Sequence, residues 1–245
     1  LLSTDDLIKT GSISREVADF LNLCVKNRLN IIVSGGTSTG KTTFLNILSN
    51  FIPINERIIT IEETPELNLR PGHVLNMEGK PPNIEGVGEI TLSMLIRNSL
   101  RMRPDRLIVG EIRGKEAVDV LQAMNTGHEG SMTTIHANSP LDLLSRLETM
   151  LLMSGINLNP VSAKKIMSSS IDIIIQLERN ENGFRFLTKI SGIFFNKINR
   201  ADDIDIEIKD LIKFEHKLDK NKYVFSPDLK IFYKEIEKKG KKIVS

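Results

Sequence analysis

The sequence predicts an α/β fold in which a mainly parallel sheet is covered by helices on both faces. Short β-branched runs alternate with stretches of helical periodicity from residue 14 to residue 195. A glycine-rich turn joins the first of these runs directly to a helix. Alternating strands and helices build parallel sheets, because each crossover helix returns the chain to the same edge and covers one face.

The first half of the chain begins this alternation. Apolar residues recur at helical spacing between Val17 and Val25, and Ser12 or Ser14 is the expected N-cap. The segment 78–90 is rich in glycine and proline, and we expect it to be a loop. The predicted elements are a helix over 14–27, a strand over 30–36, a helix over 41–52, and strands over 57–63 and 73–77.

The second half continues the pattern. Pro140 lies near the first turn of a helix, where its missing N–H is tolerated. From about residue 196 the chain becomes rich in Lys, Asp and Ile, with a hairpin predicted over 213–225 and a basic helix over 228–239. The elements before this tail are helices over 91–102, 114–124, 139–153 and 160–169, and strands over 105–112, 130–137, 171–178 and 184–195.

The composition of the 245 residues is that of a globular protein, with 40% hydrophobic and 26% charged residues. No apolar run approaches the roughly 18 residues that a membrane-spanning helix needs. The net charge of +2 argues against a dedicated nucleic-acid-binding protein. The single cysteine, Cys24, cannot form an internal disulfide, and its apolar helical setting predicts a place in the core.

The turn after the first predicted strand carries a phosphate-binding motif. A glycine, four residues and Gly-Lys-Thr form the P-loop pattern at 35–42. Glycines let consecutive N–H groups turn toward phosphate oxygens, and the following helix points its positive dipole end at the same anion. Lys41 supplies a positive charge for the β- and γ-phosphates, and Thr42 offers a hydroxyl to Mg²⁺. The predicted phosphate-binding residues are Gly35, Gly36, Thr37, Ser38, Thr39, Gly40, Lys41, Thr42 and Thr43.

Two predicted strands end in the carboxylates that such a site needs. Glu111 follows one apolar strand, and Glu62 and Glu63 follow another. The carboxyl ends of parallel strands are where such sheets bind ligands. Gly110 stands where an aspartate is usual, so Glu111 would act through water on the metal or on the nucleophile. Because strand neighbours point oppositely, only one of Glu62 and Glu63 is expected to face the nucleotide.

Basic side chains surround the same strands. His136 ends the strand predicted over 130–137, from which it could reach the γ-phosphate. The chain has no Cys or His cluster at zinc spacing. One or two arginines near Glu111 are candidates for arginine fingers toward a neighbouring subunit. These arginines are Arg97, Arg101, Arg103, Arg106 and Arg113.

Four segments, taken in order, resemble the boxes that mark the secretion ATPase superfamily. They are the P-loop at 35–42, the acidic "TIEETPEL" at 60–67, the Walker B-like "GEIRG" at 110–114, and the histidine box "TGHEGSMTTIHA" at 126–137. This superfamily groups motors of type II and type IV secretion, of pilus extension and retraction, and of archaeal flagella. Residues 81–140 and "SRLETM" at 145–150 are most similar to the tight-adherence (Flp) pilus assembly ATPase.

The resemblance implies a RecA-like fold, a hexameric ring, and ATP with Mg²⁺ as ligands. Ser38 stands where the family's loop commonly has glycine, so this position needs a backbone angle that serine tolerates. Glu63 likewise stands where aspartate is usual. We predict catalytic roles for Glu111, Glu62, His136 and Arg113, nucleotide binding by His128, and magnesium binding by Thr42 and Glu63, partly through water.

The resemblance also predicts the surroundings of the chain. Residues 1–12 would end a linker from a missing N-terminal domain, 13–195 would form the RecA-like ATPase domain, and 196–245 a divergent C-terminal appendage. ATP would lie between the upstream domain and this one. The expected partner is an inner-membrane platform protein of a pilus or secretion system, and the expected location is cytoplasmic, at the inner face of the cell membrane. Direct nucleic-acid binding is not expected.

Three other functions fit part of the sequence. A nucleic-acid translocase on the same core would need a basic, aromatic-rich surface, whereas aromatic residues make up 5% of the chain and tryptophan is absent. A GTPase would carry Asn-Lys-x-Asp or Thr-Lys-x-Asp, which does not occur. A scaffold without turnover is disfavoured because Lys41 and Glu111 are both present. The sequence therefore predicts an ATP-hydrolysing motor for pilus assembly or secretion, with a translocase as the alternative.

Overall fold

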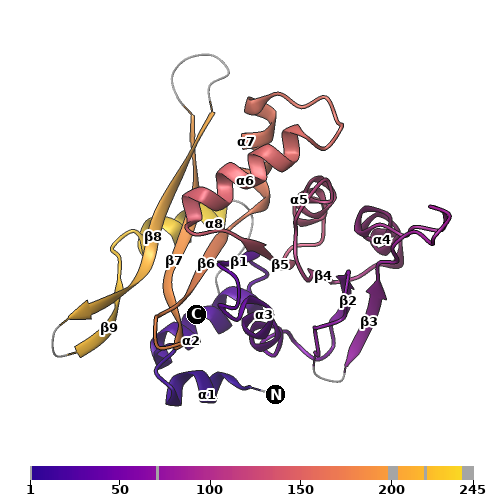
Figure 1. The fold of residues 1–245 in the computed structure, drawn as a ribbon. Coiled ribbons are helices and arrows are strands. Elements are labelled where there is room, and N and C mark those ends of the chain that lie inside the picture. Colours follow the sequence, from indigo (N-terminus) through magenta and orange to yellow (C-terminus); the bar gives the residue numbers. More distant parts are fainter. Residues whose placement is uncertain (1, 70–71, 198–203, 218–219, 239–245) are drawn as a thin grey trace.

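In the described part of the chain, nine strands form one sheet (Figure 1). The computed structural model describes residues 2–69, 72–197, 204–217 and 220–238. The strands are β1 (Ile31–Gly35), β2 (Arg57–Glu62), β3 (His73–Glu78), β4 (Arg106–Val109), β5 (Met132–His136), β6 (Ile173–Arg179), β7 (Arg185–Lys197), β8 (Ile204–Lys217) and β9 (Lys220–Phe225). Their order is β3-β2-β4-β5-β1-β6-β7-β8-β9.

The sheet has a parallel part and an antiparallel part. Strands from β3 to β6 pair in parallel, and strands from β6 to β9 pair antiparallel. In the parallel part, β1 lies between β5 and β6, so that Gly35 is in register with His136 and Leu177. The carboxyl ends of these strands therefore meet at one edge, as the predicted α/β class requires.

Helices cover both faces of the sheet. On one face lie α2 (Arg15–Lys26), α3 (Lys41–Ser49) and α8 (Leu229–Lys238), within one apolar core. On the other face lie α4 (Leu92–Ser99), α5 (Ala117–Asn125), α6 (Pro140–Leu152) and α7 (Pro160–Ser170), within a second core. Neighbouring residues of β1 divide between the two, since Ile31 and Val33 join the first core and Ile32 the second. The predicted α/β class, with a mainly parallel sheet flanked by helices, is confirmed.

The helix ends follow their sequence signals. Ser14 rather than Ser12 caps α2, because its hydroxyl accepts the N–H of Val17 at 3.3 Å. Pro140 occupies the first turn of α6, as predicted. Two short helices complete the set, α1 (Thr4–Lys9) in the segment predicted as linker, and the 3₁₀ turn η1 (Leu100–Met102). Among the helices of the described residues, none has the length and hydropathy of a membrane-spanning segment.

The C-terminal tail continues the same sheet and the same core. Strands β8 and β9 form the hairpin predicted over 213–225, and α8 corresponds to the helix predicted over 228–239, whose last residue lies outside the described residues. Phe232 of α8 is fully buried, with its ring 6.1 Å from the ring of Phe194 in β7. The boundary predicted at residue 196 therefore falls within β7, and the described tail shares its core with the preceding residues.

A buried ion pair closes the amino edge of the sheet. Arg106 is fully buried at the start of β4, and its guanidinium donates to both carboxylate oxygens of Glu56 at 2.6 and 3.2 Å. It also donates to the carbonyl of Val25 at 2.7 Å. A Cβ on Gly130 would lie 2.7 Å from the Arg106 guanidinium, so this position needs glycine. Arg106 is thus a structural residue and cannot serve as an arginine finger.

Candidate nucleotide-binding site

The phosphate-binding loop joins β1 to α3 at the carboxyl edge of the sheet. Ser38 and Gly40 adopt left-handed backbone angles, with φ of +59° and +90°. Gly40 precedes α3 and provides no side chain to cap it, so the first N–H groups of the helix remain for an anion. The left-handed angle at Ser38 costs about 1–2 kcal/mol for a residue with a Cβ, which is strain that the rest of the loop must balance.

Close packing fixes the start of the loop. A Cβ on Gly35 would lie 2.5 Å from the Thr39 hydroxyl and 2.8 Å from the carbonyl of Leu177, so a larger residue does not fit. The Thr39 hydroxyl donates to the carbonyl of Gly36 at 2.9 Å and closes the turn. The packing at Gly35 and the bond of Thr39 therefore define the shape of the loop by themselves.

Lys41 lies against this loop and is half-buried. Its ammonium donates to the carbonyls of Gly35 and Gly36 at 3.1 and 3.0 Å. Burial lowers the pKa of Lys41, Glu111 opposes this shift, and Arg113 adds to it. An ammonium that has lost part of its hydration gains strongly from a nearby anion, which suits a phosphate ligand.

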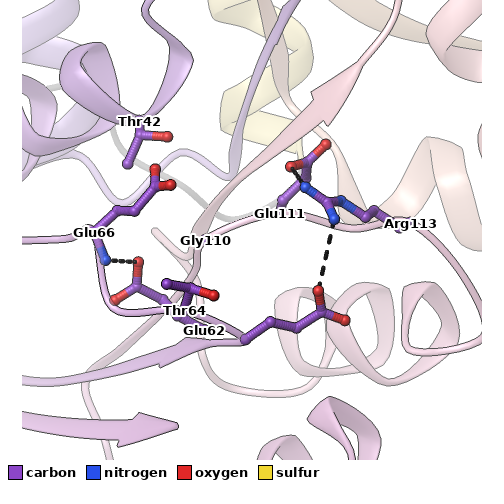
Figure 2. Close-up of a pocket in the computed structure, with 8 residues that line it drawn as sticks. Thr42, Glu62, Thr64, Glu66, Gly110, Glu111 and Arg113 are labelled. Carbon is purple, nitrogen blue, oxygen red and sulfur yellow. Dashed lines mark hydrogen bonds and ion pairs between the residues drawn. The ribbon is translucent and has the colours of Figure 1, made fainter. Parts of the chain in front are cut away.

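An acidic cavity of about 120 Å³ lies between α3 and the ends of β2 and β4 (Figure 2). It brings together Thr42, Glu62 at the end of β2, Glu63 just after it, and the pair formed by Glu111 and Arg113. The sequence analysis assigned all five of these residues to the site. The lining residues are Thr42, Glu62, Glu63, Thr64, Glu66, Gly110, Glu111 and Arg113.

Glu62 is buried and anchors the turn that follows β2. Its Oε1 accepts the backbone N–H groups of Glu66 at 3.0 Å and of Leu67 at 2.9 Å. A Cβ on Gly110 would lie 3.0 Å from Glu62 Cγ and 3.3 Å from its Oε1. The side chain of Glu62 thus fills the space that an aspartate at position 110 would need. Glu63, by contrast, has a side chain that is 63% exposed.

Glu111 and Arg113 form a close pair at the rim of the cavity. Arg113 Nη2 lies 2.7 Å from Glu111 Oε2 (Figure 2). Its Nη1 lies 3.6 Å from Glu63 Oε2. The bond to Glu111 raises the pKa of Arg113. The backbone N–H of Arg113 donates to Glu116 Oε1 at 2.6 Å, which holds the segment after β4 in place. An exposed cation therefore lies between the two carboxylates.

The two histidines of the histidine box lie at opposite edges of the sheet. His136 ends β5 in register with Gly35, and strand alternation from Met132 places it on the α3 side. His128 lies in the loop before β5, where its carbonyl accepts the hydroxyl of Ser131 at 2.7 Å. The structure brings His136 to the phosphate-binding loop and leaves His128 away from this chain's own loop.

The remaining arginines do not line the cavity. Arg97 Nε pairs with Asp119 Oδ1 at 2.8 Å on the α4–α5 side. Arg103 has a left-handed φ of +53° and, with Arg101, belongs to the turn before β4. Of the five predicted arginines, Arg113 is the one that the cavity includes.

Sequence reasoning missed Glu66 and Arg185. Figure 2 shows the carboxylate of Glu66 directed toward Thr42, within the same cavity. Its signal was present in "TIEETPEL", but a glutamate in a proline-containing turn is not marked by strand periodicity. Arg185 Nε donates to the carbonyl of Ser38 at 2.8 Å, across 147 positions of sequence. No local pattern could have indicated that contact.

The donors around Thr42 suit a hard cation. They are a hydroxyl and carboxylates, and such all-oxygen sets favour Mg²⁺ over metals that prefer sulfur or nitrogen. Within the residues that the structure describes, no group of three or more Asp, Glu, His or Cys could hold a metal unaided.

Comparison with known proteins identifies the family. A family profile described as "Type II/IV secretion system protein" matches residues 2–192. The chain belongs to this family. The predicted secretion ATPase superfamily is thereby confirmed, whereas the closer similarity to the tight-adherence ATPase stays a prediction.

Several members of the type II/IV secretion family resemble the chain. The type IV secretion system protein VirB11 of Bartonella quintana is 35% identical over 198 residues, which are 80% of this chain and 54% of that protein. The crystal structure of the VirB11 ATPase of Brucella suis, in complex with sulphate, is 31% identical with a TM-score of 0.64, over 75% of this chain and 53% of that one.

A pilus motor of the same family also shares the fold. The pilus retraction motor PilT, solved with bound ADP, is 26% identical with a TM-score of 0.56, over 73% of this chain and 50% of that one. The chain spans about half the length of the curated relatives that it matches.

Proposed function

We propose that this chain binds ATP with Mg²⁺ and hydrolyses it, as the motor domain of a machine for pilus assembly or protein secretion. The observation that carries the proposal is one juxtaposition at the carboxyl edge of the sheet. There Thr42, which follows Lys41 at the end of the phosphate-binding loop, shares a single cavity with the carboxylates of Glu62, Glu66 and Glu111. Membership of the secretion family supports the same activity.

The first step is capture of the triphosphate by the loop. The uncapped N–H groups at the start of α3 and the charge of Lys41 bind the β- and γ-phosphates. Lys41 then exchanges its bonds to the carbonyls of Gly35 and Gly36 for bonds to phosphate oxygens. Because its charge is partly buried, this exchange is favourable.

Mg²⁺ would be held by the hydroxyl of Thr42, with Glu63 and Glu66 acting directly or through water. When bound, it neutralises part of the negative charge of the phosphates. The carboxylate of Glu62 keeps the turn that carries Glu66 in position through its two backbone bonds. Removing the anchor would displace Glu66 from Thr42.

Glu111 orients the attacking water and accepts its proton. In this structure its carboxylate is paired with Arg113 at 2.7 Å. An incoming γ-phosphate competes for the exposed guanidinium, so that Arg113 moves to the phosphate and Glu111 is released for the water. We propose that His136, which is in register with Gly35 at the start of the loop, donates to a γ-phosphate oxygen.

The base and ribose of ATP fit a second cavity beside the loop, of about 300 Å³. Its walls include Phe44 and Ile47 of α3, Phe184 and Phe186 of the β6–β7 hairpin, and Leu7 of α1. Apolar and aromatic walls next to a phosphate site are typical of nucleotide pockets. We propose that adenine occupies this cavity.

We further propose that the protein works as a homo-hexameric ring at the cytoplasmic face of the inner membrane. The relatives VirB11 and PilT are a type IV secretion protein and a pilus motor, which supports a membrane platform protein as the partner. In such a ring an upstream domain would close over the nucleotide, and an arginine other than Arg113 would act on a neighbouring subunit.

The test is ATP turnover by the purified protein and two variants. Lys41→Ala and Glu111→Gln should each lower kcat by at least about 100-fold. Lys41→Ala removes the positive charge that binds the phosphates, and Glu111→Gln removes the base. Lys26→Ala, at the exposed end of α2, is the matched control and should match the wild type. Equal turnover by all four proteins would overturn the proposal, and turnover that depends on single-stranded DNA would indicate a translocase.

A further inference from the structure

Arg185, the first residue of β7, lies against the phosphate-binding loop. Its Nε donates to the carbonyl of Ser38 at 2.8 Å. Its Cδ lies 3.3 Å from the position that a Cβ on Gly40 would take. Arg185 thus contacts both residues of the loop that have left-handed angles, Ser38 and Gly40.

The bond to the Ser38 carbonyl fixes the direction of the next N–H group. No cis peptide occurs in the described residues, and in a trans peptide the C=O and the N–H point in opposite directions. The Ser38 oxygen is held toward Arg185, so the N–H of Thr39 points away from Arg185. Backbone N–H groups whose direction is fixed in this way are the donors with which such loops bind phosphate.

The C-terminal hairpin holds the strand that carries Arg185. The hydroxyl of Tyr223 in β9 donates to the carbonyl of Leu187 at 2.9 Å and to that of Ser12 at 2.7 Å. The rings of Phe186 and Phe214 lie 5.1 Å apart, and those of Phe214 and Tyr223 lie 5.2 Å apart. These contacts join β7, β8 and β9 just beyond Arg185. Phe214 and Tyr223 lie outside the segment 2–192 that matches the family.

We propose that Arg185, which also lines the second cavity, keeps the phosphate-binding loop in its anion-binding shape, and that the β8–β9 hairpin keeps Arg185 in place. The proposal rests on nucleotide binding at this loop. Without the guanidinium, the peptide between Ser38 and Thr39 loses its fixed direction, and the strained angle at Ser38 loses a supporting bond. The nucleotide must then order the loop as it binds, which weakens affinity.

The test compares Arg185→Ala and Arg185→Lys with Arg179→Ala. Arg179 ends β6 in register with Arg185, and its guanidinium packs on Gly183, so it controls for charge and for hairpin stability. ADP affinity in the presence of Mg²⁺ is measured by calorimetry, and KM and kcat are measured for ATP. Arg185→Ala should raise both the Kd for ADP and KM about tenfold, equivalent to about 1.4 kcal/mol, with a smaller change in kcat.

The other variants separate geometry from charge. Arg185→Lys keeps the charge but lacks the planar guanidinium, so it should restore only part of the affinity. Arg179→Ala should bind ADP like the wild type. Phe214→Leu and Tyr223→Phe should raise KM in the same direction as Arg185→Ala, by a smaller factor. Because Arg185 is exposed, its variants should melt within a few degrees of the wild type.

Each outcome decides a separate question. Wild-type affinity for ADP in Arg185→Ala, or a loss that appears in kcat alone, would overturn the role of Arg185. Unchanged KM in both Phe214→Leu and Tyr223→Phe would overturn the role of the hairpin. A wild-type protein that binds no ADP would instead contradict the proposed function, because the loop would then have no nucleotide to position.

Discussion

At the scale of single residues, the acidic cavity depends on a side chain from one strand that fills the space left by a glycine after the neighbouring strand. Gly110 provides no side chain, and Glu62 from the adjacent strand fills the space above it. The carboxylate that reaches this space also binds two backbone N–H groups of the following turn. Glu62 therefore has a structural role in addition to the catalytic role predicted from its motif. The sequence does not reveal this structural role, because a carboxylate at this position suits either one.

Substitutions of Glu62 separate the anchor from the charge. Glu62→Ala leaves the N–H groups of Glu66 and Leu67 without their acceptor, which should cost about 1–3 kcal/mol. Glu62→Gln keeps an amide oxygen at the same place, so its free energy of unfolding should stay within about 0.5–1 kcal/mol of the wild type. Denaturant unfolding measures both values. Equal destabilisation by Ala and Gln would contradict the anchor.

The pKa of Lys41 predicts a pH-dependent difference in stability. Burial lowers this pKa from its ordinary 10.5, so the unfolded chain holds more protons at Lys41 than the folded chain between the lowered value and 10.5. Stability from this group therefore rises with pH across that window. Lys41→Met removes the buried charge, and should melt about 1–3 °C above the wild type near pH 7. The difference should shrink as pH approaches 10.5.

Thermal melting of both proteins between pH 7 and pH 10.5 checks this prediction. A variant that melts below the wild type at every pH, with a constant difference, would show that the bonds from Lys41 to Gly35 and Gly36 outweigh the burial of its charge. Lys41→Met should also fail to turn over ATP. A variant that is more stable but inactive would show that Lys41 lowers stability and is needed for function.

At the scale of elements, periodicity and turn residues predicted most strands and helices before the structure. The strand into the phosphate-binding loop, the helix after it and the helix capped by Ser14 are local patterns, and local patterns can be read in sequence. The strand order could not be predicted this way. It depends on contacts such as those of β1 with β5 and β6, which join residues far apart in the chain.

The residues of the candidate site also fall into those that local sequence patterns predict and those that depend on distant contacts. Lys41, Thr42 and Glu111 belong to compact motifs and were predicted, whereas Arg185 reaches the loop through a distant hairpin and was not. Arg106 shows the opposite error. Its charge and its neighbourhood resembled those of a functional arginine, but the fold buries it completely against Glu56.

The Arg106–Glu56 pair predicts strong coupling at the amino edge. Glu56→Leu alone leaves the buried charge of Arg106 without a carboxylate, and Arg106→Met alone leaves Glu56 with only the exposed Arg28 at 3.4 Å, so each should cost about 3–5 kcal/mol. The double variant should be less destabilised than either single variant, because no unpaired charge remains in the pair. Denaturant unfolding of the four proteins gives the coupling energy. Additive effects of the two single substitutions would contradict a coupled pair.

At the scale of the whole molecule, the tail and the nucleotide-binding part share one interior. Phe232 of α8 packs on Gly192, where a Cβ would lie 2.8 Å from its ring, and beside Phe194. The family match ends at residue 192, yet the described sheet and core extend well beyond it. The tail is therefore expected to contribute to the stability of the part that resembles the family.

A single substitution tests this shared interior. Phe232→Ala should lower the free energy of unfolding by about 3–5 kcal/mol, through lost contacts and a cavity. Ile231→Ala changes the next residue of α8, whose side chain is 46% exposed, and should cost less than about 1 kcal/mol. Both variants are compared by denaturant unfolding. Equal, small effects would show that the tail is dispensable for the core.

The central place of β1 also affects how the protein is made. Ile31 has strand neighbours on both sides only after Met132 and Ile173 have been synthesised. Translation proceeds at about 5–20 residues per second, so an apolar strand and its glycine turn leave the ribosome roughly 7–30 seconds before the sheet can enclose them. The nascent chain therefore exposes an aggregation-prone apolar segment for much of its synthesis. Chaperones that shield such segments would act on this protein before any nucleotide does.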